Sequence, residues 1–237
     1  MTEILADIKP FVRPTWKPVT SNVDGSLSAS KFSGRPWLAA EESWPECQNC
    51  GNPMQFFVQL NLDGLPEPLA GEFGSGLLQM FYCTNQDPAC EIDCEAYCAF
   101  AKSVLLRVVK TTGQSHEAEI PSLEYHFPAK TIVGWQAMED YPNYEEGQML
   151  GVQLTDEEWD EWCDEDYPRS GDKLAGWPFW VQGVEYPSCP ICQQTMRLVF
   201  QIDSEVNIPY MWGDSGCGHI TQCKEHKDQL AFGWACC

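Results

Sequence analysis

The sequence predicts a mainly β protein, a β-rich α+β fold, built from two internally duplicated β units that each carry a zinc-ribbon-like knuckle pair. Three observations lead to this prediction: apolar strand-like segments cut by Gly and Pro, an internal repeat, and Cys-x-x-Cys pairs at matching places in the repeat. Self-similarity at a fixed spacing indicates duplicated structural units. The Cys-x-x-Cys pairs and the strands that follow them are therefore assigned to equivalent positions of the two repeats.

The repeat extends over two pairs of aligned segments. Residues 31–61 match residues 173–203 without a gap at a constant offset of 142, and after a small gap residues 76–83 match residues 216–223. The identities fall mostly on Gly, Pro and Cys, which have special backbone or ligand properties. The identical pairs are Lys31/Lys173, Gly34/Gly176, Pro36/Pro178, Pro45/Pro187, Cys47/Cys189, Cys50/Cys192, Met54/Met196 and Gln59/Gln201.

This alignment divides the chain into four parts. The 237 residues suffice for two units of about 100–120 residues, each able to bury a core. The predicted parts are an N-terminal extension (1–30), a first repeat (31–138), an acidic connecting segment with a short helix (139–172) and a second repeat (173–237).

Strands and one helix are predicted from local pattern. Runs rich in Phe, Val, Leu and Ile over strand-like lengths predict strands within residues 54–62, 76–82, 102–109, 130–138 and 196–203. Residues 154–166 predict a helix, because Thr155 is followed three residues later by Glu158 in a capping-box arrangement. Trp159 and Trp162 are spaced to share one face of that helix.

The cysteine pairs of the second repeat predict a metal site. A Cys-x-x-Cys turn brings two thiolates to one cation, and zinc needs two further ligands to complete a tetrahedron. Cys189 and Cys192 supply the first pair, and "CKEH" supplies Cys223 and His226 with the same spacing. The predicted site therefore has three thiolates and one imidazole.

The first repeat predicts an all-thiolate site. Cys47 and Cys50 are followed by Cys83 and Cys90, and Cys94 is a credible substitute for Cys90. More than 30 residues separate the knuckles, which exceeds usual zinc-ribbon spacing, but a strand and a loop fit into the gap. We expect one or two structural Zn²⁺ ions, in closed sites without a catalytic water.

Other uses of cysteine and histidine have weaker support. A thioredoxin-like pair should open a helix after a strand, whereas both pairs here precede a strand. His116 and His126 match no metalloprotease helix pattern, so we interpret them as ordinary surface or satisfied histidines. The remaining cysteines are interpreted as buried free thiols, with a stray ligand from the terminal "WACC" as the alternative; they are Cys98, Cys163, Cys217, Cys236 and Cys237.

Composition restricts the partners. The net charge of −21 disfavours nucleic acid and anionic membranes, and it allows attraction to a basic protein. No apolar run is long enough to span a bilayer, and no signal peptide is evident, so we expect a cytoplasmic protein.

An acidic belt concentrates the charge. Residues 139–166 contain twelve carboxylates, no Lys or Arg, and interleaved aromatics. Such a block is either a solvated face or a docking site for a basic partner, and the sequence leaves both open. The carboxylates are Glu139, Asp140, Glu145, Glu146, Asp156, Glu157, Glu158, Asp160, Glu161, Asp164, Glu165 and Asp166.

These motifs resemble a known family. "SGRPWL…WPECQNCGNPMQFFVQLNLDGLP" with "GLLQMFYC", and "AGWPFWVQ…YPSCPICQQTMRLVFQID…WGDSGCGHITQC", resemble the YwqG-like domain over about residues 30–237. That domain is related to programmed cell death protein 2 and its yeast ribosome-assembly relative. The resemblance implies a duplicated, mainly β fold, no enzymatic activity, and a chaperone-like role in holding a ribosomal protein.

Two classes of function follow as hypotheses. The first is a non-enzymatic, chaperone-like module that holds a basic client polypeptide. The alternative is a thiol- or zinc-dependent enzyme, or a neutralising partner of a toxin. No catalytic or organic-cofactor residues are assigned, and the oligomeric state is left open.

Overall fold

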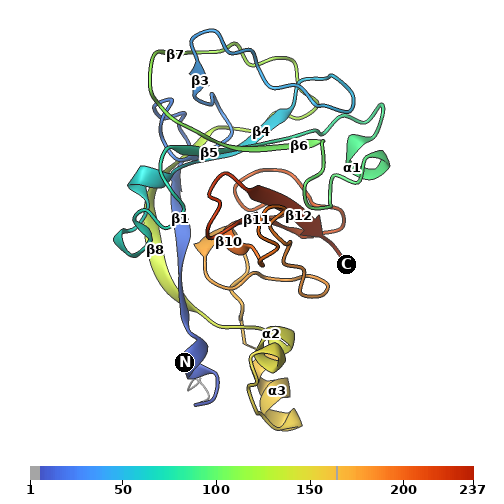
Figure 1. Cartoon of the computed structure of the whole chain (residues 1–237). Coiled ribbons are helices and arrows are strands. Elements are labelled where there is room, and N and C mark those ends of the chain that lie inside the picture. The colour runs from blue at the N-terminus through green and yellow to red at the C-terminus, as the bar shows by residue number, and fades with distance from the viewer. Residues whose placement is uncertain (1–5, 164) are drawn as a thin grey trace.

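The computed structural model describes residues 6–163 and 165–237, and it confirms a mainly β fold. Ten antiparallel strands form one strongly curved sheet, and a two-stranded sheet lies beside it (Figure 1). The strands are β1 (Arg13–Ser21), β2 (Lys31–Phe32), β3 (Leu38–Ala39), β4 (Gln55–Asn61), β5 (Leu77–Tyr82), β6 (Val104–Val109), β7 (Ser115–His116), β8 (Lys130–Asp140), β9 (Lys173–Ala175), β10 (Arg197–Asp203), β11 (Cys217–Gln222) and β12 (Leu230–Ala235).

Short helices connect these strands. The predicted helix within 154–166 is confirmed as α3, whereas α1 and α2 were not predicted. The helices are η1 (Lys9–Phe11), η2 (Leu62–Gly64), η3 (Glu67–Leu69), α1 (Cys90–Asp93), α2 (Tyr144–Met149) and α3 (Asp156–Cys163). None of the helices in the described part of the chain has the length and apolar character that crossing a membrane requires.

The strand order of the large sheet reflects the repeat. The order is β12-β11-β10-β9-β1-β8-β2-β4-β5-β6, so β9, β10, β11 and β12 of the second repeat mirror β2, β4, β5 and β6 of the first. Strands β1 and β8 pair with each other at the centre. Because β6 also contacts β12, the sheet is nearly closed into a barrel.

The main core lies between the two half-sheets, β4 to β6 on one side and β10 to β12 on the other (Figure 1). The ring of Phe57 stacks on that of fully buried Trp212, with 5.2 Å between ring centroids. Tyr82 approaches Trp212 edge-on at 5.1 Å. Since Phe57 and Tyr82 belong to the first repeat and Trp212 to the second, the repeats share this core.

A buried glutamine holds the same loop in each repeat. Gln59 Nε2 donates to the carbonyl of Ala29 at 2.8 Å, and Gln201 Nε2 donates to that of Gly171 at 2.8 Å. Both pairs are related by the offset of 142 residues. The polar identities of the repeat therefore satisfy buried backbone groups, which would otherwise lose free energy on leaving water.

Each repeat also buries one lysine. Lys31 Nζ lies 2.6 Å from Asp24, and Lys173 Nζ lies 2.9 Å from Asp140. The two carboxylates come from unrelated places in the sequence, before β2 and at the end of β8. Asp140 and its lysine are both fully buried, whereas Asp24 is partly exposed.

Strand β1 was missed because Pro14 and Pro18 interrupt its pattern. It nevertheless pairs along its length with β8 on one edge. On the other edge, β9 pairs only with Thr15 and Trp16, so little of that ladder requires donors from β1. Proline is tolerated in strands where pairing is incomplete.

Helices α2 and α3 project from the sheet with a small core of their own (Figure 1). The predicted capping box is present, because Glu158 accepts from the N–H of Thr155 and the Glu158 N–H donates to Thr155 Oγ1. Trp159 and Trp162 are both buried, as predicted for one shared face. Ile8 near the N-terminus joins this core.

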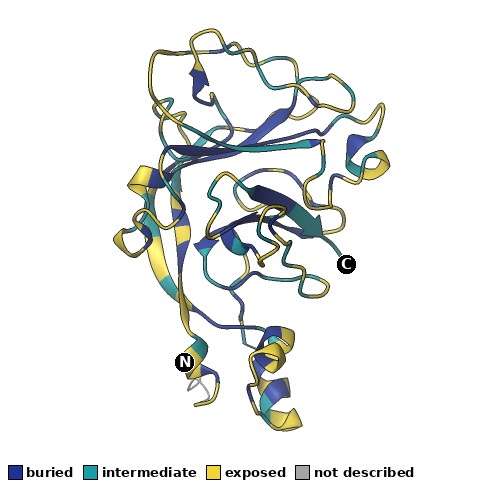
Figure 2. Cartoon of the chain, in the orientation of Figure 1, coloured by how far each residue is buried: buried dark blue, intermediate teal, exposed yellow. Residues whose placement is uncertain are grey.

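The acidic belt does not lie wholly on the surface. Asp140 is buried against Lys173, and Glu146 is buried and accepts a hydrogen bond from the Tyr186 hydroxyl at 2.6 Å. Burial raises the pKa of Glu146. Asp164 lies outside the described residues. The exposed members, on and around α3 (Figure 2), are Glu139, Glu145, Asp156, Glu157, Asp160, Glu161 and Asp166.

Candidate metal centres

The first cluster contains four cysteine sulfurs. Cys47, Cys50, Cys83 and Cys90 present ligand atoms that all lie within 4.8 Å of one another. Cys47 and Cys50 come from the turn before β4, Cys83 follows β5, and Cys90 begins α1. The fold therefore brings together the four predicted residues from three separate segments.

Cys94, the possible substitute for Cys90, is not among the four clustered ligands. It lies just after α1, where it packs against the apolar surroundings of the cluster. Cys90 is fully buried, whereas Cys94 is partly exposed. The short helix directs the earlier cysteine to the site, and this helix was not predicted.

The second cluster has three sulfurs and one imidazole nitrogen. Cys189, Cys192, Cys223 and His226 also present ligand atoms within 4.8 Å of one another. The Nδ1 atom of His226 lies 3.6 Å from Cys223 Sγ and 3.8 Å from Cys189 Sγ. The structure brings these predicted residues together from the turn before β10 and the turn after β11.

The turn that carries each Cys-x-x-Cys pair has the same backbone in both repeats. The N–H of Gly51 donates to the carbonyl of Cys47, and the N–H of Gln193 donates to that of Cys189, both at 2.8 Å. Gly51 has φ 74° and Gln193 has φ 60°. The same left-handed residue thus closes each turn, and glycine fits it with less steric cost.

The distances match a tetrahedral metal site better than disulfides. Sulfur–sulfur separations are 4.0 Å for Cys47–Cys90, 3.6 Å for Cys50–Cys83 and 3.6 Å for Cys192–Cys223. A tetrahedron with Zn–S bonds of about 2.3 Å has edges of roughly 3.8 Å, whereas a disulfide requires about 2.05 Å. Both donor sets therefore fit a metal ion that prefers four N/S ligands.

Backbone N–H groups stabilise the thiolates that such a metal requires. The N–H of Asn49 points to Cys47 Sγ at 3.4 Å, and the N–H of His226 points to Cys223 Sγ at 3.3 Å. The latter hydrogen bond lowers the pKa of Cys223 to about 6. In the first cluster, desolvation by burial raises the pKa of Cys83 to about 12.

A known protein family covers most of the chain, including both repeats. The model of a family described as "Domain of unknown function (DUF1963)" matches residues 30–235. The chain belongs to the DUF1963 family. The matched region begins just before β2 and ends in β12, so the DUF1963 domain includes both clusters.

One relative shares a short segment with this DUF1963 protein. The "Uncharacterized protein YpfL" of Salmonella typhimurium is 45% identical over 38 residues, which is 16% of this chain. The aligned segment spans 9% of the length of that relative. This likeness is local and carries no argument about the function of either protein.

The surplus cysteines do not follow the prediction of buried thiols. Only Cys217 is buried, because it lies within β11. Cys98, Cys163 and Cys237 are exposed, and Cys236 is partly exposed; Cys163 ends α3, and the other three lie in a loop or beyond the last strand, where less of the chain covers them. None of the five belongs to the two ligand groups formed by the described residues.

The other histidines divide into two kinds. His116 Nδ1 lies 2.8 Å from the carbonyl of Ala39, and His126 is exposed, which agrees with their interpretation as satisfied or surface residues. His219 is buried in β11, and no role was predicted for it. The repeat alignment contained a signal, because it pairs His219 with Gln79.

Proposed function

We propose that this DUF1963 protein is a non-enzymatic, chaperone-like module that holds a basic polypeptide, with two Zn²⁺ ions stapling its fold. The observation that carries the proposal is a strongly negative, partly apolar surface on α2 and α3. We also propose that the protein acts in the cytoplasm, where reduced thiols stay available to metal.

The carboxylates of α3 support the binding of a basic partner. Asp156, Glu157, Asp160 and Glu161 are all exposed within this eight-residue helix. Among the exposed carboxylates of the belt in the described part of the chain, Asp166 alone forms an ion pair, with Arg169. Uncompensated charge of one sign raises the local concentration of oppositely charged partners and steers their association.

Apolar side chains on α2 give this surface contact area as well as charge. Met149 is 74% exposed and Leu150 is 41% exposed, at the end of the helix that packs on α3. Tyr144 is also exposed and stands edge-on to Trp159 with ring centroids 4.9 Å apart. Aromatic and Met side chains beside a polar rim are typical of protein interfaces.

The metal centres support a structural role. Four N/S ligands in each cluster would complete the coordination of Zn²⁺ and leave no position for a catalytic water. Cys47, Cys50, Cys83 and Cys90 would hold one ion, and Cys189, Cys192, Cys223 and His226 the other. Each ion would cross-link the loops at the adjoining ends of two paired strands, β4 with β5 and β10 with β11.

The resemblance to the YwqG-like domain adds a candidate for the client. Eukaryotic relatives of that domain hold a newly made ribosomal protein, and ribosomal proteins are strongly basic. The net charge of −21 on this chain is complementary to such a client. We therefore propose a ribosomal protein as the client, by analogy at the level of the domain.

A charge-matched comparison tests the proposal. In one variant Asp156→Asn, Glu157→Gln, Asp160→Asn and Glu161→Gln are combined. The control combines Glu41→Gln, Glu117→Gln, Glu119→Gln and Glu124→Gln, which are also exposed but lie in the first repeat. Each immobilised protein is incubated with cell lysate at low and at moderate salt, and the retained proteins are identified.

We expect the wild type and the control to retain a defined basic protein, and the α3 variant to lose most of it. The retention should weaken with salt, because the attraction is between exposed charges. Retention of no basic protein by the wild type, or equal retention by all three proteins, would contradict the proposal.

A further inference from the structure

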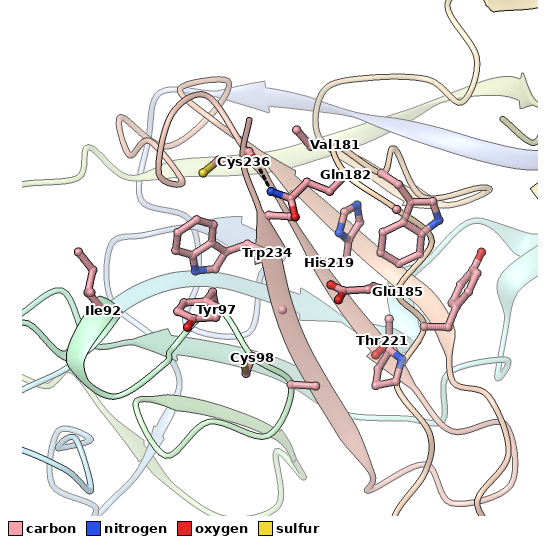
Figure 3. A pocket seen from close by; sticks show the side chains of 17 residues that line it. Ile92, Tyr97, Cys98, Val181, Gln182, Glu185, His219, Thr221, Trp234 and Cys236 are labelled. Atoms are coloured by element: carbon pink, nitrogen blue, oxygen red, sulfur yellow. Dashed lines mark hydrogen bonds between the residues drawn. The ribbon is translucent and has the colours of Figure 1, made fainter. Parts of the chain in front are cut away.

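A cavity of about 640 Å³ lies between the second repeat and the segment around α1 of the first repeat, and none of the clustered candidate ligands lines it (Figure 3). Its walls come from the loop after α1, from the loop between β9 and β10, and from β11 and β12. Tyr97, Trp180 and Trp234 form aromatic walls, and His219 and Glu185 supply polar atoms. This volume is in the range of ligand pockets.

The equivalent place in the first repeat contains an arginine side chain. Arg107 of β6 pairs in register with Gln79 of β5, and its Nε donates to Gln79 Oε1 at 2.9 Å. Its Nη1 also donates to the carboxylate of Glu42. The guanidinium lies 5.8 Å from the ring centroid of Phe81. A carboxylate, an amide oxygen and an aromatic ring therefore surround this cation.

The second repeat keeps polar acceptors and lacks the arginine, and Thr221 stands where the first repeat has Phe81. In the matching register His219 pairs with Gly233, so a glycine stands where β6 has Arg107. His219 Nε2 lies 3.1 Å from the carbonyl of Phe179, as Gln79 Nε2 lies 2.7 Å from that of Trp37. Since a carbonyl only accepts, Nε2 of His219 carries the proton, and Nδ1 remains an acceptor as Gln79 Oε1 is.

The cavity also keeps a carboxylate. Glu185 lines it, one residue beyond the position that aligns with Glu42. Glu185 forms no ion pair with any residue in 6–163 or 165–237, and the lining contains no Lys or Arg. After burial, the charges of Glu95 and Glu185 raise the pKa of Cys98 at the cavity wall, as expected for a negative local potential.

We propose that this cavity binds the guanidinium group of an arginine side chain from an extended basic polypeptide. The bound group takes the place that Arg107 occupies in the first repeat, with Glu185 and His219 as acceptors and an aromatic wall beside it. That the arginine belongs to a polypeptide rests on the proposed function. The preference for a guanidinium group rests on the comparison of the two repeats.

Peptide titration of the ¹⁵N-labelled full chain tests the preference. The probes are capped Gly-Gly-Arg-Gly-Gly and the same peptide with citrulline or with lysine at the centre. Citrulline has nearly the shape of arginine without its charge, and lysine has the charge without the planar fork. We expect the arginine peptide to shift the indole N–H signals of Trp180 and Trp234 and to bind roughly fivefold more tightly than either analogue.

Two variants locate the site. Glu185→Gln should lower the affinity for the arginine peptide to that for the citrulline peptide, whereas Glu117→Gln, at an exposed position in the first repeat, should leave it unchanged. Gly233→Arg should fill the cavity from within and abolish the shifts. A Cβ at Gly233 would stand 3.1 Å from the carbonyl oxygen of Tyr97, so a small shift of that loop suffices.

The outcomes separate this inference from the proposed function. Equal binding of the three peptides, indole shifts that Glu185→Gln leaves unchanged, or the absence of any shift would overturn the cavity proposal, even if lysate retention through α3 is observed. Selective arginine binding that depends on Glu185 would support it, even if the lysate experiment retains no basic protein. Free L-arginine binding as tightly as the capped peptide would overturn the assignment to a polypeptide.

Discussion

The side chains of Gln79 and His219 make the same hydrogen bond in the two repeats. Gln79 Nε2 donates to the carbonyl of Trp37 at 2.7 Å, and His219 Nε2 lies 3.1 Å from the carbonyl of Phe179. Amide and imidazole differ in one respect that matters for stability, because only the imidazole titrates. Burial, together with the charge of Lys173, lowers the pKa of His219 to about 3.

His219→Gln should therefore reduce the loss of stability in acid. The pKa of His219 is lower in the folded state than the unfolded value of 6.5, so the unfolded chain takes up the proton first. The contribution of neutral, buried His219 to the free energy of unfolding is present above pH 6.5 and is lost as the pH falls toward 3. Between pH 6.5 and about 5, the free energy of unfolding of the wild type should fall by about 2 kcal/mol more than that of the variant, measured by urea unfolding. Parallel pH profiles for both proteins would show that His219 is not buried as a neutral imidazole.

Each metal centre should bind one zinc ion independently. Native mass spectrometry of protein purified without chelator should report two ions per chain, and Cys189→Ser should retain one. Removal of a thiolate leaves the second site with three ligands, whereas the first site keeps its four cysteines. A chelator should lower the thermal midpoint of the wild type, because metal that binds only the folded chain stabilises it.

Cys98→Ser is the matched control for the metal count. Cys98 is exposed and belongs to neither ligand group, so this variant should keep both ions. Elemental analysis then identifies the metal. A wild-type chain that binds no transition ion, or a Cys189→Ser variant that loses both, would refute two independent structural sites.

The two buried lysines should differ in their importance for stability. Lys173→Met leaves the fully buried Asp140 charged and without its cation, which costs on the order of 3–5 kcal/mol. Lys31→Met leaves Asp24, whose side chain is 25% exposed and can be hydrated again, so a smaller loss is expected. Urea unfolding of the two variants under identical conditions compares them, and an equal or reversed order would contradict this explanation.

Gly147 should be required for the packing of α2 on α3. A Cβ at this position would lie 2.5 Å from Cη2 of Trp159, which is buried in the small core. Gly147→Ala should displace that ring and increase amide hydrogen exchange throughout α3, although alanine favours helices intrinsically. Zinc content should not change, because neither metal centre contacts this core. Unchanged protection of α3 would mean that the tryptophan can move without loss of packing.

Local sequence features predicted much of this molecule. The capping box of Thr155 and Glu158, the shared face of Trp159 and Trp162, and the five strand segments depend on neighbours in the chain, so their pattern was sufficient. The internal repeat predicted that three cysteines of each repeat meet, because equivalent turns and strands hold Cys47, Cys50 and Cys83 in the first repeat and Cys189, Cys192 and Cys223 in the second.

Long-range packing decided the features that the sequence left open or missed. The choice of Cys90 over Cys94 depends on a four-residue helix that is too short to show periodicity. Strand β1 has two prolines, and only its place beside β8 and the short β9 makes them acceptable. Asp140 and Glu146 were counted with the acidic belt, but they are buried, where they bind Lys173 and Tyr186 respectively.

The sequence by itself determined the duplicated β architecture and seven of the eight residues that gather in the two clusters, because periodicity, turn residues and spacing are properties of neighbours along the chain. Only the tertiary structure decided which carboxylates are buried, that the two repeats share one core, and that Gly233 leaves open the place that Arg107 fills. Asp140 and Glu146 are buried by partners 33 and 40 residues away, and the shared core joins residues of both repeats, so side-chain burial is set by partners across the fold and not by neighbours in the chain.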